Sequence, residues 1–112
     1  MTAAPPSNRI KEVDRVGLHA VLESEKRVLV EFWAPWCVQC GPMGRVVERF
    51  VEDLAADVAI LKASLEDEAI ADEYGLMSLP AMCLFIEGEP SKLVTGFKGA
   101  PALREEFATL VA

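Results

Sequence analysis

The sequence predicts one α/β domain, built on a central mixed β-sheet of four to five strands with about four helices around it. Three apolar runs, residues 28–33, 58–63 and 81–86, are typical of strands that are covered on both faces. Helical patterns separate these runs, which favours parallel pairing, and a turn followed by a fourth run predicts an antiparallel hairpin at one edge. The 112 residues suffice for one such domain at residues 9–112, after a flexible start at residues 1–8.

The first two elements precede the longest apolar strand. Residues 9–13 alternate weakly between apolar and polar side chains and predict a short edge strand. Asp14 is a candidate N-cap for a helix that runs to about Ser24, with apolar residues on one face. His19, the only histidine, lies beside that face, and we expect an ordinary helix-surface role for it.

Two of the predicted central strands each carry one charged residue. Glu31 interrupts residues 28–33, and Lys62 interrupts residues 58–63. Charged side chains are seldom fully buried without a partner, and burial raises the pKa of a carboxyl group toward neutrality. Glu31 is therefore either a proton acceptor or donor inside the protein or a side chain at an exposed strand edge. If the two strands are neighbours, the carboxylate and the ammonium are expected to pair.

A helix with a strongly apolar face is predicted for residues 38–55. Cys37 and Cys40 lie where the preceding strand ends and this helix begins. The unpaired N–H groups and the macrodipole at a helix N-terminus stabilise a thiolate, so this position predicts a site of thiol chemistry. Pro42 removes one backbone donor a few residues inside the helix, and we expect a distorted first turn or a kink there.

The second half of the chain completes the sheet and its cover. Residues 66–74 predict a short acidic helix, with Gly75 as its C-cap. After the third apolar strand, residues 87–90 predict a turn and residues 92–95 a hairpin strand. Pro101 suits the first position of a last helix, which carries apolar residues on one face.

Composition excludes several classes of function. The net charge is −7, and no basic stripe with interleaved aromatic residues is present, so nucleic acid is not an expected partner. No run approaches the roughly 18 apolar residues of a membrane span, and residues 1–8 lack the features of a secretory signal, so we expect no membrane partner and a cytoplasmic location. Three cysteines are too few, and odd in number, for a secreted disulfide scaffold.

Two cysteines separated by two residues have three chemical interpretations. Cys37 and Cys40 can close a small disulfide ring, chelate a metal, or present one reactive thiol with a second one to resolve it. A zinc site needs further ligands, and the only other candidates are His19 and Cys83, so metal or iron–sulfur binding would require paired chains. Cys83 lies in an apolar strand and is expected to be inert packing.

Four motifs in order make the chain resemble the thioredoxin family over nearly its whole length. The motifs are Val30-Glu31-Phe32-Trp33-Ala34-Pro35-Trp36-Cys37 with Cys40, then Tyr74-Gly75-Leu76-Met77-Ser78-Leu79-Pro80, then Glu87-Gly88-Glu89, and Thr95-Gly96. The resemblance implies the thioredoxin fold and a thiol–disulfide oxidoreductase that acts on proteins. It also implies that no metal or organic cofactor is needed beyond a redox-active Cys37–Cys40 disulfide.

The resemblance also implies catalytic roles. Cys37 is expected to be the nucleophile that attacks a substrate disulfide, and Cys40 the buried resolving thiol that expels the product. A first cysteine nearer to solvent and to the helix end is expected to be the more acidic one, which agrees with these roles. Glu31 falls where the family usually has a buried aspartate, which implies a proton relay to Cys40, and Lys62 falls on the lysine that partners it.

A substrate-binding surface around Cys37 is implied in the same way. Pro80 matches the cis-proline of the family, and the backbone of Leu79 before it is expected to pair with a bound substrate in the manner of a strand. Phe97 is a bulkier rim residue than the family usually has. The residues expected to contact substrate are Trp36, Val38, Gln39, Leu79, Pro80, Gly96 and Phe97.

The chain departs from the family pattern around the cysteines. Val38 and Gln39 replace the usual Gly-Pro, Gly41 replaces a lysine, and Arg45 stands where the kink proline usually lies. Residues between the cysteines tune thiol acidity and potential. We expect a reductase of protein disulfides, with a disulfide isomerase, an oxidase, or a protein-binding module of weak redox activity as alternatives. The expected partners are disulfide-containing proteins and a thioredoxin reductase as electron donor, and the chain is expected to be a monomer.

Overall fold

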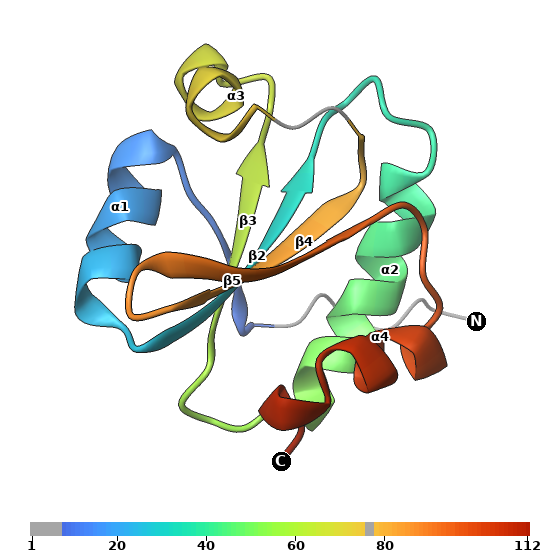
Figure 1. The fold of residues 1–112 in the computed structure, drawn as a ribbon. Coiled ribbons are helices and arrows are strands. Elements are labelled where there is room, and N and C mark those ends of the chain that lie inside the picture. Colours follow the sequence, from blue (N-terminus) through green and yellow to red (C-terminus); the bar gives the residue numbers. More distant parts are fainter. Residues whose placement is uncertain (1–7, 76–77) are drawn as a thin grey trace.

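The computed structural model describes residues 8–75 and 78–112. Most of the predicted flexible start and two residues of the predicted loop before Pro80 therefore lie outside the described residues. The elements, in chain order (Figure 1), are β1 (Ile10–Glu12), α1 (Arg15–Ser24), β2 (Arg27–Trp33), α2 (Cys40–Phe50), a 3-10 turn (Val51–Asp53), β3 (Ala59–Ser64), α3 (Glu68–Tyr74), β4 (Ala81–Ile86), β5 (Glu89–Thr95), α4 (Ala100–Glu106) and a second 3-10 turn (Ala108–Leu110).

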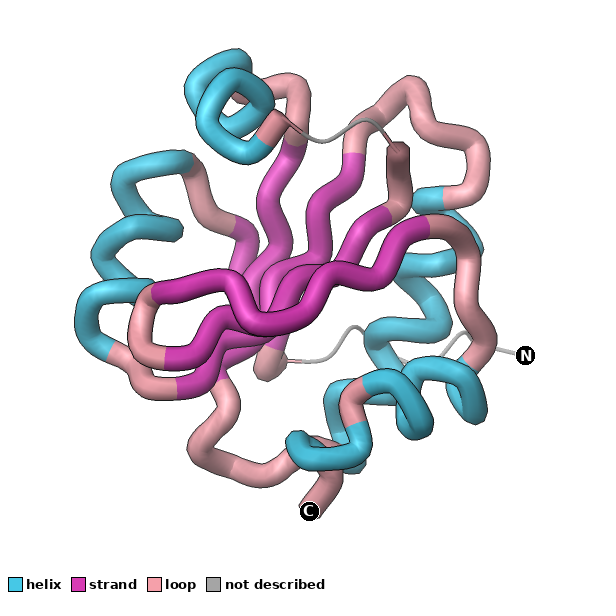
Figure 2. Tube along the Cα trace, in the orientation of Figure 1, coloured by secondary structure: helices cyan, strands magenta, loops and turns pink. Residues whose placement is uncertain are grey.

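The strands form one mixed sheet in the order β1-β3-β2-β4-β5. Strands β1, β3 and β2 run parallel, whereas β4 is antiparallel to β2, and β5 is antiparallel to β4. Figure 2 shows these strands as a single layer with helices on both sides. The predicted mixed sheet with an antiparallel hairpin at its edge is confirmed.

Helices cover both faces of the sheet, which explains the continuous apolar run of β2. Figure 1 shows α1 and α3 on one face and α2 and α4 on the other. Val28, Val30 and Phe32 pack under α1 and α3, while Leu29 packs under α2 and α4. Since successive side chains of a strand point to opposite faces, Glu31 points toward α2 and α4 with Leu29.

Helix α2 begins two residues later than predicted, at Cys40 rather than Val38. This start places Pro42 in the first turn, where backbone N–H groups have no partner within the helix, so the proline costs no helical hydrogen bond. The next residue, Met43, already donates its backbone N–H to the carbonyl of Gln39 at 3.0 Å. The helix then continues without a break to Phe50.

Side-chain caps begin α1 and α3, the two helices on the face opposite α2, and a glycine cap ends α3. Asp14 caps α1, as predicted, by accepting the backbone N–H of Gly17 at 2.8 Å. Asp67 caps α3 in the same way, so this helix begins at Glu68 rather than at residue 66. Gly75 ends α3 with a φ of 55°, the left-handed C-cap that the sequence predicts.

The hairpin between β4 and β5 is tighter than predicted. Its turn consists of Glu87 and Gly88, which both have positive φ angles of 50° and 83°. Strand β5 therefore begins at Glu89, and Pro90 lies within it instead of in the turn. A proline is tolerated there because β5 is an edge strand, where a missing backbone donor interrupts no central ladder.

Arg9, directly before β1, ties the beginning of the domain to the segment that follows α2. Its guanidinium donates hydrogen bonds of 2.6 to 3.1 Å to four backbone carbonyl oxygens. The acceptors are Val51, Leu54, Ala55 and Val58. These residues lie in the 3-10 turn and the loop between α2 and β3, so Arg9 fastens this connection by adding side-chain donors to its backbone carbonyls.

Arg9→Met is expected to lower the free energy of unfolding by about 2 kcal/mol, because methionine keeps the apolar stem but removes the guanidinium donors from these four carbonyl groups. Chemical denaturation at pH 7 measures the change. Arg45→Met, at an exposed position of α2, is the matched control and is expected to cost less than about 0.5 kcal/mol. Equal stability of the two variants would show that water replaces the Arg9 guanidinium at no cost.

Candidate active site

Cys37 and Cys40 are joined by a disulfide, with their Cα atoms 5.4 Å apart. Cys37 lies in the loop after β2 and is only partly buried, whereas Cys40 is the first residue of α2 and is 6% exposed. The backbone folds tightly here, since the N–H of Cys37 bonds to the carbonyl of Ala34 and the N–H of Cys40 bonds to the carbonyl of Cys37. One sulfur therefore lies at the surface and the other beneath it.

The N-terminus of α2 provides a positive electrostatic environment for these sulfurs. Its N-cap, Gln39, makes no side-chain capping bond, and the first turn contains no acidic residue. The partial positive charge of the helix end is therefore not neutralised by the helix's own side chains, and it favours a thiolate in the reduced protein.

Exposed apolar side chains flank Cys37 in the chain. Trp36 is 66% exposed and Val38 89%, and Phe97, in the loop after β5, is 44% exposed. A groove with a volume of about 530 Å³ runs beside Cys37. Its lining residues are Trp36, Cys37, Val38, Gln39, Leu65, Ala71 and Leu79. The structure thus brings most of the predicted substrate-contact residues together.

The remaining predicted contact residues lie at the ends of β4 and β5. The Leu79–Pro80 peptide bond is cis, as predicted. The carbonyl of Pro80 accepts a hydrogen bond of 2.8 Å from the backbone N–H of Gly96, whose φ of 87° favours glycine. The N–H of Lys98 lies 3.4 Å from the sulfur of Met43 in α2, so the loop that carries Phe97 is attached to the helix of the cysteines.

Glu31 is the one charged residue among the described residues that is fully buried, at 2% exposure. A Cβ atom at Gly44 would lie 4.0 Å from Glu31 Oε2, and Gly44 is one helical turn after Cys40. The carboxyl group therefore faces the side of α2 that carries Cys40. Burial raises the pKa of the Glu31 carboxyl to about 7, against the opposing effect of the Lys62 charge.

Lys62 is the direct neighbour of Glu31 across β2 and β3, but the two charged groups do not pair. No hydrogen bond or ion pair of the described residues joins them, and Glu31 Oε2 has no hydrogen-bond partner there. The Lys62 ammonium lies 4.6 Å from the centre of the Trp33 ring instead. Trp33 Nε1 in turn donates to Glu12 Oε2 at 3.1 Å.

Sequence reasoning missed Leu65 and Ala71 of the groove and the contact between Glu12 and Trp33. Leu65 directly follows β3, and its N–H bonds to the carbonyl of Trp33 at 2.8 Å. An apolar residue just after a parallel strand is a usable signal, because the carboxyl ends of parallel strands meet at one edge of a sheet. No signal in the sequence identified the Glu12 contact, since it depends on strand register.

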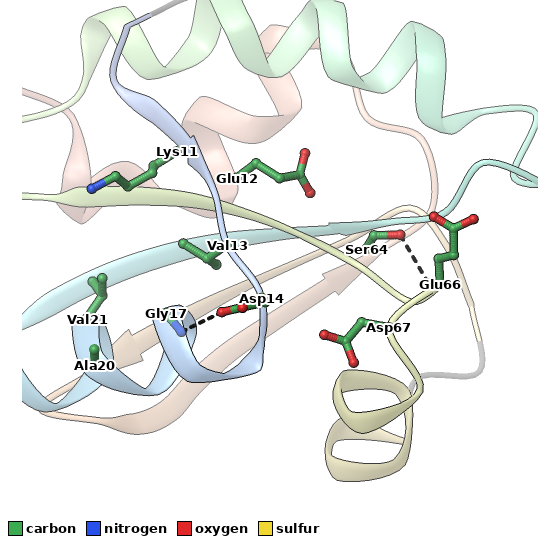
Figure 3. A pocket seen from close by; sticks show the side chains of 10 residues that line it. All are labelled: Lys11, Glu12, Val13, Asp14, Gly17, Ala20, Val21, Ser64, Glu66 and Asp67. Carbon is green, nitrogen blue, oxygen red and sulfur yellow. Dashed lines mark hydrogen bonds between the residues drawn. The ribbon is translucent and has the colours of Figure 1, made fainter.

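A larger open pocket of about 810 Å³ lies away from the cysteines (Figure 3). Four carboxylates are among its lining residues, and three of them already accept hydrogen bonds: Asp14 and Asp67 as helix caps, and Glu12 from the Trp33 indole. In residues 8–75 and 78–112, no group of three or more histidine, cysteine or acidic side chains is arranged to hold a metal ion. No helix in this part of the chain is long and apolar enough to cross a membrane.

The sequence also drew attention to His19 and Cys83, and both lie outside this site. His19 is partly exposed on α1 and forms an ion pair of 2.7 Å with Glu73 of α3. Cys83 is 6% exposed within β4, where burial raises the pKa of its thiol to about 11.

The site joins a surface cysteine and a buried one by a disulfide at the N-terminus of a helix, and the sheet beside it carries a buried carboxyl group. These features define a thiol–disulfide oxidoreductase that works by dithiol–disulfide exchange. The thioredoxin family model matches residues 13–109, and the chain belongs to the thioredoxin family. It is a protein-disulfide oxidoreductase.

Known proteins similar to this chain include thioredoxins from bacteria and an archaeal thioredoxin of known structure. A thioredoxin from Mycobacterium tuberculosis is 35% identical over 112 residues, which cover 99% of this chain and 97% of that protein. A bifunctional thioredoxin reductase/thioredoxin from Mycobacterium leprae is 35% identical over 92 residues, 81% of this chain and 20% of that protein. The solved structure of a mutant thioredoxin from Halobacterium salinarum superposes with a TM-score of 0.79 at 27% identity, covering 98% of this chain and 97% of that one.

Proposed function

We propose that this chain reduces disulfides of cytoplasmic proteins and receives its electrons from a thioredoxin reductase, and that it thereby takes part in electron transport and cell redox homeostasis. The observation that carries the proposal is the difference in exposure between the two bonded sulfurs, because only the Cys37 side is open to a protein substrate. A dithiol reductant works where thiols are kept reduced, which is the reason for placing it in the cytoplasm. The relative that joins a reductase to a thioredoxin supports the electron donor.

The proposed cycle transfers two electrons. The Cys37 thiolate attacks one sulfur of the substrate disulfide, and the other substrate sulfur leaves as a thiolate that takes a proton. The Glu31 carboxylate then accepts the proton of the Cys40 thiol, and the Cys40 thiolate attacks Cys37 Sγ. This step closes the Cys37–Cys40 disulfide and releases the second substrate thiol. A reductase restores the dithiol with two electrons and two protons.

Substrate is proposed to bind over the apolar surface beside Cys37. The exposed side chains of Trp36 and Val38 and the adjacent groove give an extended segment a place to pack. Lys62 is proposed to act as the electrostatic partner of Glu31, since its charge opposes the rise in the Glu31 pKa. The proposed contact residues are Trp36, Val38, Gln39, Leu79, Pro80, Gly96 and Phe97.

The redox potential of the Cys37–Cys40 pair tests the direction of the reaction. We expect a midpoint potential of about −270 mV at pH 7, well below the glutathione poise. The chain is equilibrated in a thiol–disulfide buffer, quenched, and its free thiols are counted by alkylation and mass spectrometry. Cys83→Ala is the control and is expected to leave the potential unchanged, because this cysteine is buried and has no partner cysteine.

Two other results would redirect the proposal. Val38 and Gln39 are both exposed between the cysteines, where residue identity tunes the potential. A potential near about −120 mV would assign an oxidant or isomerase in place of a reductase. Failure of the pair to form a reversible disulfide would favour a protein-binding module.

A further inference from the structure

Three charged residues form one row across the sheet on the face that α2 covers. Glu12 of β1 is the register partner of Lys62 in β3, and Lys62 is also the register partner of Glu31 in β2. Side chains at paired positions lie on the same face of a sheet. Figure 3 shows the side chain of Glu12 on the opposite side of β1 from Val13, which packs with the α1 face. The row therefore begins at the open edge of the sheet and ends at the buried carboxyl group.

Trp33 connects the outer members of this row. Its indole N–H donates to Glu12 Oε2 at 3.1 Å, and its ring lies 4.6 Å from the Lys62 ammonium. The hydrogen bond fixes the orientation of the ring, and the negative charge that accepts it strengthens the attraction of the ring for a cation. Glu12 thus holds the indole in a position that attracts Lys62.

Lys62 in this position leaves Glu31 Oε2 without a partner among the described residues. The ammonium lies over the indole, and Glu31 Oε2 accepts no hydrogen bond from the described residues. We propose that Glu12 is a positioning residue for Glu31, which acts through Trp33 by holding Lys62 on the indole ring and out of contact with the Glu31 carboxyl group. This inference rests on the proposed role of Glu31 as the proton acceptor of Cys40.

The charges that face Glu31 act together with this arrangement. Lys62 faces it from β3 and lowers its pKa, whereas Glu48 from α2 and Glu12 from β1 raise it. Strand β4 presents Met82, which carries no charge. Loss of Glu12 therefore has two effects of the same sign: one negative charge disappears, and Lys62 becomes free to approach Glu31. Both effects favour the ionised carboxylate.

The test is a pH titration of the Glu31 side-chain carboxyl carbon by NMR in the oxidised protein. The wild-type midpoint is expected at about 7. Glu12→Gln keeps an acceptor for the indole N–H and removes only the charge, and it is expected to lower the midpoint by about 0.5 pH unit. Glu12→Leu also releases the indole and is expected to lower the midpoint by about 1 pH unit and to shift the Trp33 indole N–H resonance.

Glu105→Gln, an exposed acidic position on α4, is the control for a change in net charge and is expected to leave the midpoint in place. An unchanged Glu31 midpoint in Glu12→Leu would overturn the proposal. Equal shifts in Glu12→Leu and Glu12→Gln would also overturn it. The loss of the Glu12 charge would then account for the whole effect, and the orientation of the Trp33 ring would not determine the position of Lys62.

The same variants separate this inference from the proposed function. In insulin reduction, the acidic limb of the pH profile is expected to move down with the Glu31 midpoint in Glu12→Leu, which a merely structural role would not produce. If Glu31→Gln reduces insulin at the wild-type rate, Glu31 is not the proton relay, whereas shifts of the Glu31 midpoint in the Glu12 variants would still support the positioning role of Glu12. If the Glu31 midpoint does not shift in the Glu12 variants but Glu31→Gln reduces insulin slowly, the positioning role of Glu12 is wrong and the proton relay through Glu31 stands.

Discussion

The Cys37→Ser variant is expected to lose reduction of insulin disulfides by at least about 10³-fold. A serine hydroxyl is not ionised at neutral pH and forms no disulfide, so the first bond of the cycle cannot form. Insulin reduction with dithiothreitol as electron donor measures the loss against the uncatalysed rate.

Cys40→Ser is the matched control for this prediction, because it removes the other sulfur of the same disulfide. This variant retains the nucleophile and lacks the group that resolves the intermediate, so it is expected to accumulate a mixed disulfide with its substrate that survives in non-reducing gels. A covalent adduct formed by Cys37→Ser and absent from Cys40→Ser would reverse the two proposed roles.

Glu31→Gln is expected to make the oxidised protein more stable than the wild type at pH 8. The free energy of unfolding of the variant minus that of the wild type is expected to be about 3 kcal/mol larger at pH 8 than at pH 4. In the wild type the folded state keeps the Glu31 proton up to a pKa of about 7, whereas the unfolded chain loses it from about 4.5. The unfolded state therefore binds fewer protons between these values, and the stability of the wild type falls as pH rises through this range. Glutamine carries no such proton, so the variant does not share this fall.

Urea denaturation of both proteins at several pH values measures this difference. The same substitution is expected to slow the reduction of insulin at pH 7 by about 10²-fold, because Cys40 loses its proton acceptor. A stability difference that stays constant from pH 4 to pH 8 would show that Glu31 titrates like an exposed glutamate. Greater stability together with lower activity would identify the buried carboxylate as a cost that the fold bears for its chemistry.

Strong local signals account for the parts of the fold that the sequence predicted. The limits of β4 agree with the prediction because its apolar run ends directly at a turn. Asp14 and Gly75 were identified as caps because their chemistry is local, a side-chain oxygen before a helix and a glycine after one. The positions of Cys37 and Cys40 at the strand–helix junction followed from the same kind of signal.

The structure differs from the sequence-based predictions where tertiary surroundings override local preference. Pro90 was assigned to the turn, as its local preference indicates, but the edge position of β5 makes a strand proline harmless. The start of α2 moved to Cys40, which puts Pro42 in the one part of a helix that needs no donor. Register alone brought Lys62 beside Glu31, while the competing attraction of the Trp33 ring decided where its ammonium lies.

The burial of Cys83 isolates the electron exchange from the third cysteine of the chain. With a thiol pKa of about 11, only about one molecule in 10⁴ carries this sulfur as a thiolate at pH 7, and the thiolate is the form that attacks disulfides. Cys83 therefore does not compete for the mixed disulfide on Cys37. The three cysteines thus provide one two-electron couple, with no internal exchange between alternative disulfides.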